Sequence, residues 1–156
     1  MNWLMIVLRL IHVGGGAMWV GMMAFMTFYL TPALAEAGPD GAKVMAALQK
    51  QRIMVVMPII ALLTIGSGLW LMMRLYGNPS NIVGSRMGMA LNVGAASAII
   101  AFVIGIVLMR PLMMRSMTAT DPAEAQRLRA RSATLGRAVA RLLMLALGAM
   151  AVARYL

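Results

Sequence analysis

The sequence contains no cysteine, and its only acidic residues are Glu36, Asp40, Asp121 and Glu124. Without cysteine the chain forms no disulfide and has neither a thiolate metal site nor a cysteine nucleophile. None of the four carboxylates falls inside a long hydrophobic stretch, so we expect no proton or cation relay of the carboxylate type within a membrane. The chain also lacks a phosphate-binding glycine loop, a zinc-protease helix and a nucleophile elbow. Hydrolase chemistry is therefore disfavoured, and the sequence does not favour an enzyme.

Charged residues of both signs are scarce, because they make up 12% of the chain whereas hydrophobic residues make up 62%. A soluble domain carries roughly twice that charged fraction, which indicates an integral membrane protein. About 20 apolar residues cross the roughly 30 Å hydrocarbon layer as a helix. Apolar stretches of that length lie at about 3–30, 53–73, 87–109 and 135–154. The sequence therefore predicts an all-α bundle of four transmembrane helices that forms a single membrane domain over 1–156.

Basic residues outnumber acidic ones by 14 to four, which gives a net charge of +10. Most of them lie next to the predicted spans, where basic residues orient a membrane protein and contact anionic lipid headgroups. They are most frequent in the connections after the first and the third span. The positive-inside rule therefore predicts that these connections are cytoplasmic and that both termini lie outside the cytoplasm. No basic and aromatic module stands apart from the spans, so we expect no nucleic-acid partner.

Two local signals predict how the longer connections are built. Asp121, Pro122 and Glu124 form a strong helix start, with a cap residue, a proline at the first helical position and an acid at the third. From there an amphipathic cytoplasmic extension over about 121–134 leads into the fourth span. In the first connection, Asp40 follows a glycine-proline turn and is predicted to cap a helix that runs directly into the second span.

The only histidine of the chain, His12, lies inside the first predicted span and is followed closely by three glycines. An ionisable residue inside a membrane helix is costly, so its default interpretation is functional, with a partner inside the bundle. Gly16 lies one turn from His12 and leaves space for a flat ring beside the imidazole, as a haem ligand requires. Arg9, one turn away on the other side, either reaches the outer membrane interface or pairs with a haem propionate. In the alternative interpretation, His12 hydrogen-bonds Asn92 or a serine in a polar layer and binds nothing.

The chain has 19 methionines, and thioethers are soft ligands that suit Cu(I). His12, Met23 and Met26 recur at helical spacing on one face of the first span, which makes them a candidate copper site. Methionine is also a flexible apolar filler, and filling is its usual role in a membrane bundle. The methionines alone therefore do not decide between a metal site and a packed core.

The first span resembles the first helix of the copper-resistance protein D (CopD) family: LRLIHVGGGAMWVGMMAFMTFYLTPAL has the leucine-histidine start, a tryptophan, a glycine and a closing proline. The second span, QRIMVVMPIIALLTIGSGLWL, is similar to that family and to the HemJ-type protoporphyrinogen oxidases, and the last helix, RLRARSATLGRAVARLLMLAL, also looks like theirs. These resemblances imply a four-helix bundle in the bacterial inner membrane. The first analogy implies a part in copper movement, and the second implies that His12 ligates haem b. The HemJ-type pattern has a lysine in the third span, where this chain reads GSRMGMALNVG. The resemblance therefore does not extend to porphyrinogen oxidation.

Three functions remain open from the sequence. The first is haem b binding for redox chemistry or haem handling, with His12, Gly16, Arg9, Met23 and Asn92 as the candidate cofactor-binding residues. One histidine cannot supply two imidazoles, so the second ligand would be Met23 or another methionine, an open position, or His12 of a second chain. The second is copper handling. The third is a structural or assembly subunit of a larger membrane complex. Besides membrane lipids, we expect the partners to be further copies of the chain or the subunits of such a complex.

Overall fold

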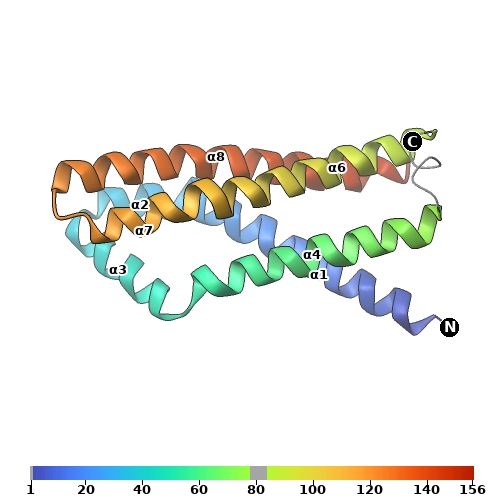
Figure 1. Ribbon diagram of the computed structural model, residues 1–156, viewed down its shortest axis with the longest axis horizontal. Helices are drawn as coiled ribbons and strands as arrows, with labels where there is room; N and C mark the ends of the chain where they lie inside the picture. The colour runs from blue at the N-terminus through green and yellow to red at the C-terminus, as the bar shows by residue number, and fades with distance from the viewer. Residues whose placement is uncertain (1, 78–83) are drawn as a thin grey trace.

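The computed structural model describes residues 2–77 and 84–156, and within these residues the chain is helical and contains no strand (Figure 1). Four helical segments in this part of the chain are long and apolar enough to cross a membrane: Trp3–Glu36, Ile53–Tyr76, Arg86–Thr118 and Pro122–Ala153. The predicted all-α class is confirmed, and the chain has the build of a multi-pass helical membrane protein.

Two of these segments contain a π-helical turn just before a proline. The first consists of α1 (Trp3–Phe25), the π-helix η1 (Met26–Leu30) and α2 (Thr31–Glu36), and it continues past the predicted end at residue 30. The third consists of α6 (Arg86–Val103), the π-helix η2 (Ile104–Met109) and α7 (Arg110–Thr118). Pro32 and Pro111 each lack an N–H and crowd the carbonyl of the preceding turn, which favours a wider turn there. The prolines thus widen these helices instead of ending them.

The first connection differs from its prediction in two respects. Its helix α3 (Pro39–Lys50) is preceded by Gly38, and Asp40 pairs with Lys43 at 2.7 Å without capping the helix. The helix also does not run into the second span, because Arg52 has a φ of 58° and separates it from α4 (Ile53–Tyr76). A left-handed residue of this kind ends an α-helix. The predicted cap and the predicted continuous helix are therefore both wrong.

The last helix begins as predicted. The Asp121 carboxylate accepts hydrogen bonds from the backbone N–H groups of Ala123 and Glu124, at 3.0 and 3.3 Å, and Pro122 occupies the first turn. These bonds satisfy donors that have no partner inside the helix. From this cap α8 (Pro122–Ala153) runs without a break, so the predicted extension over 121–134 and the predicted fourth span form one helix.

The helices pack as two pairs, α1 with α4 and α6 with α8. A buried cluster joins the pairs near the middle of the bundle and consists of Trp19, Ala61, Ala101, Val139 and Leu143. Both chain termini lie at one end of the molecule, and the turn between α7 and α8 lies at the other end with α2 and α3 (Figure 1). Toward the terminal end, α1 diverges from α8 (Figure 1).

Candidate functional site

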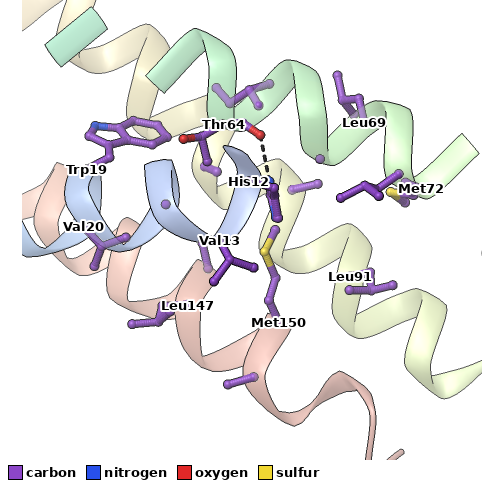
Figure 2. Close-up of a pocket in the computed structure, with 18 of the residues that line it drawn as sticks. His12, Val13, Trp19, Val20, Thr64, Leu69, Met72, Leu91, Leu147 and Met150 are labelled. Atoms are coloured by element: carbon purple, nitrogen blue, oxygen red, sulfur yellow. Dashed lines mark hydrogen bonds between the residues drawn. The ribbon is translucent and has the colours of Figure 1, made fainter. Parts of the chain in front are cut away.

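A cavity of about 630 Å³ lies between the two helix pairs and is lined by residues of α1, α4, α6 and α8 (Figure 2). It extends from Trp19 and Leu143 of the buried cluster toward the terminal end of the bundle. Its walls are mainly aliphatic side chains, and its polar lining groups include His12, Thr64 and two arginines. Small-molecule and cofactor sites are typically apolar cavities of about 300–1,000 Å³ with a few convergent polar groups.

His12 is held in this cavity by a hydrogen bond to the backbone of α4. Its Nδ1 lies 2.8 Å from the carbonyl oxygen of Thr64 (Figure 2). A carbonyl oxygen only accepts hydrogen bonds, so Nδ1 carries the proton and donates it. The neutral ring then has its lone pair on Nε2, the other ring nitrogen. Metal-ligating histidines characteristically donate one ring N–H to a carbonyl or carboxylate, which fixes both the tautomer and the ring orientation.

The hydroxyl groups around this carbonyl are already engaged with α4. The Thr64 hydroxyl donates to the carbonyl of Ile60 at 2.8 Å. The Ser67 hydroxyl donates to the carbonyl of Leu63 at 2.6 Å and also lies 3.1 Å from the Thr64 carbonyl. Both side chains are buried. Thr64 and Ser67 thus form the polar group of α4 beside His12, and His12 joins it through a backbone carbonyl and not through a side chain.

Two glycines allow α1 and α4 to approach closely enough for this hydrogen bond. A Cβ atom at Gly68 would lie 2.5 Å from Cε1 and 2.7 Å from Nδ1 of His12, so the imidazole packs directly on the backbone of α4. A Cβ atom at Gly15 would lie 2.5 Å from Oγ1 of Thr64. Small residues at helix interfaces permit such contacts in membranes. Gly68 was not identified from the sequence. The signal for it was the four-residue spacing of the small residues Thr64 and Gly68, which is typical of a helix contact surface.

The structure brings together three of the residues that the sequence singled out. Arg9, His12 and Gly16 all line the cavity. A Cβ atom at Gly16 would contact only Cγ2 of Thr64, at an ordinary 3.6 Å, so this glycine borders open space beside the histidine. Arg154, which follows the end of α8, also lines the cavity. Arg9 lies in the N-terminal half of α1 and Arg154 directly follows α8, so both residues belong to the part of the cavity lining near the two termini (Figure 1).

The other candidates lie elsewhere. Met23 packs against the buried cluster, Met26 lies in the π-helix η1, and Asn92 is half-buried on α6, and none of the three lines the cavity. The methionines that do line it are Met72 of α4 and Met150 of α8. The structure thus brings His12 together with thioethers of other helices and not with those of its own helix.

Within the described residues, no three histidine, cysteine, aspartate or glutamate side chains form a group that could hold a metal ion. Comparison of the chain with models of known protein families, with curated proteins and with solved structures finds no match.

Proposed function

We propose that the protein binds haem b in the cavity between its helix pairs, with Nε2 of His12 as an axial ligand, and acts in electron transfer or haem handling at the membrane. The observation that carries this proposal is the hydrogen bond from Nδ1 of His12 to the Thr64 carbonyl. It supports the proposal because it leaves the lone pair of Nε2 available to a metal within an apolar cavity. Haem bound there would supply a one-electron redox centre.

The remaining lining of the cavity also fits haem. Haem b is a flat, mostly apolar ring with two carboxylates on one edge, and the cavity is apolar with two arginines at one end. Guanidinium groups match the geometry of carboxylates. Arg9 lies one turn from His12 on α1, toward the same end of the molecule as Arg154. The lining of this one cavity thus contains an imidazole, apolar walls and two cations, which are the groups that would hold an amphipathic dicarboxylate ring.

The direct test is the optical spectrum of the protein, purified in mild detergent after expression with ample haem, in the oxidised and then the reduced state. We expect a Soret band that shifts on reduction. A colourless protein that also fails to take up added haem would contradict the proposal. Metal analysis of such a colourless protein would then separate copper handling from a purely structural subunit.

The two arginines are expected to bind the carboxylates of haem. Arg9→Gln and Arg154→Gln should each weaken haem binding about tenfold, which is at the low end for charge-assisted hydrogen bonds because both groups are exposed. The measurement is a titration with haem and with its dimethyl ester, which lacks the carboxylates. The ester should bind the wild type and the double variant equally.

The matched control is the double variant Arg74→Gln and Arg86→Gln. It removes the same charge from the same end of the bundle, at residues that do not line the cavity. An equal loss of haem affinity in this control would show that the arginines act only through the overall charge.

We also propose that the termini lie outside the cytoplasm in a bacterial inner membrane. The two termini share one end of the molecule (Figure 1), and the connections rich in basic residues lie at the opposite end. Because the chain has no cysteine, single cysteines can report the orientation. In intact cells, an impermeant thiol reagent should label Tyr155→Cys, whereas Thr120→Cys should be labelled only after the membrane is opened. The reverse pattern would contradict this orientation.

Copper handling is a second candidate because one observation favours it. Met72 and Met150 line the same cavity as His12, and an imidazole with thioethers is a donor set that suits Cu(I). This function predicts a colourless protein that binds Cu(I) in the cavity. Cu(I) binding that survives unchanged in His12→Ala would exclude His12 as a copper ligand.

A further inference from the structure

We propose that Met150 is the second axial ligand, so that the protein holds haem between the imidazole of His12 and the thioether of Met150. This inference rests on the proposed function and names a residue that the sequence did not single out. Both ligands then come from one bundle, so a single chain is sufficient to hold haem for electron transfer.

Met150 is seated opposite His12 by a glycine on the other helix pair. A Cβ atom at Gly94 of α6 would lie 2.9 Å from Cγ and 3.1 Å from Cε of Met150, and 3.3 Å from the Ala146 carbonyl oxygen. The side chain of Met150 therefore packs into the notch that Gly94 leaves on α6. Gly68 of α4 seats the ring of His12 in the same way. The two notches belong to different helix pairs, and the cavity lies between those pairs.

Both side chains are drawn and labelled in the close-up of the cavity (Figure 2). In Figure 2 the imidazole of His12 lies between the Thr64 carbonyl and the side chain of Met150, whose outer end, the sulfur and its terminal carbon, points toward the ring. Met150 is half-buried, and both residues line the cavity. Arg154 follows Met150 by one turn, as Arg9 precedes His12 by one turn, so each proposed ligand has an arginine toward the terminal end.

Met72 is the other methionine of the cavity lining, and its position is less suitable. It belongs to α4, the helix whose Thr64 carbonyl holds His12, and Figure 2 shows it to one side of the imidazole, near Leu69. A ligand opposite His12 must come from the facing helix pair, and Met150 does. Met72 is therefore the matched control, because it is a methionine of the same cavity on the wrong side.

Ligation by histidine and methionine has two consequences. A thioether ligand raises the reduction potential of haem, as in cytochromes c. With both residues as ligands, the iron would have no open position, so small external ligands such as carbon monoxide would bind only after the thioether is displaced. Both features suit a carrier of single electrons and do not suit a haem that binds oxygen.

The test compares wild type, Met150→Leu, Met150→His and Met72→Leu, each loaded with haem in the full chain in detergent. Leucine keeps the apolar volume but offers no ligand. We expect wild type to show the weak long-wavelength band that sulfur ligation gives ferric haem, about one haem per chain and slow binding of carbon monoxide. Met150→Leu should keep its haem through His12, lose that band, bind carbon monoxide at least tenfold faster and have a lower potential.

The two further variants complete the assignment. Met150→His should restore a six-coordinate spectrum, now with two imidazoles and without the sulfur band, and Met72→Leu should behave as wild type. A Met150→Leu protein that holds haem with the wild-type band, carbon monoxide rate and potential would overturn the assignment of Met150 alone. Transfer of these losses to Met72→Leu would overturn it as well. A wild type that takes up no haem would overturn both this inference and the proposed function.

Discussion

Replacing Gly68 with alanine is expected to remove most of the haem affinity although His12 itself is unchanged. The added methyl group would lie 2.5 Å from Cε1 and 2.7 Å from Nδ1 of the imidazole, and carbon atoms do not approach so closely. The ring must therefore move away from α4 and give up its hydrogen bond to the Thr64 carbonyl, which is 2.8 Å long. Loss of such a supporting contact typically weakens metal binding about 10- to 100-fold.

A control variant separates displacement of the imidazole from a general effect of alanine on the stability of α4. Alanine is a better helix former than glycine by about 1 kcal/mol, so the substitution does not weaken α4 itself. Gly66→Ala is the matched control, since Gly66 belongs to the same helix and a Cβ atom there has no neighbour within 4 Å. The measurement is a haem titration of both variants beside wild type. Equal affinity in wild type and Gly68→Ala would mean that the contact between the imidazole and α4 does not support binding.

The fold could be predicted in outline because composition and hydrophobic length dominate it. The four apolar stretches, the Asp121 cap and the all-α class follow from local sequence rules, and the structure agrees with them. The first connection could not be predicted in the same way. Asp40 looks like a cap in the sequence, but the turn at Gly38 and the left-handed conformation of Arg52 depend on how α3 folds back between two spans. Tertiary contacts determine these backbone conformations, and they override local sequence preferences.

The sequence predicted the site residues that lie on the first helix but not those that other helices contribute. The pattern of the first span singled out His12, Gly16 and Arg9, and all three line the cavity. Its helical spacing also favoured Met23, but packing turns that residue to the buried cluster. Met150 lies far along the chain, and only the pairing of α6 with α8 brings it to the cavity. Periodicity describes the face of one helix, whereas the neighbours of that face depend on the packing of the bundle.

The hydrogen bond that holds His12 also could not be predicted from the sequence. The sequence predicts Asn92 or a serine as its partner, because a sequence identifies polar side chains but does not show which backbone groups are nearby. The actual partner is the backbone carbonyl of Thr64. Every residue has a backbone carbonyl, so the residue type gives no sign of this role. In a membrane helix, side-chain donors that return to their own backbone leave few free groups, and Thr64 and Ser67 both do so. A backbone acceptor can be recognised only once the two helices are placed side by side.

The central claim is that His12 is a haem ligand and not a buried structural histidine, and chemical rescue tests it most directly. His12→Gly removes the imidazole and leaves a space of its shape against Gly68, which free imidazole can enter. Losing an outer contact costs about 10- to 100-fold in metal affinity, so loss of the ligand itself should exceed about 100-fold. Asn92→Ala is the control, because Asn92 is half-buried but does not line the cavity.

The measurement is the oxidised and reduced optical spectrum of wild type, His12→Gly and Asn92→Ala, each purified after expression with ample haem and then treated with imidazole. We expect a Soret band that shifts on reduction in wild type and Asn92→Ala, its absence in His12→Gly, and its return in His12→Gly when imidazole and haem are added together. A His12→Gly protein that carries haem with the wild-type spectrum before any imidazole is added would contradict the assignment of His12 as the ligand.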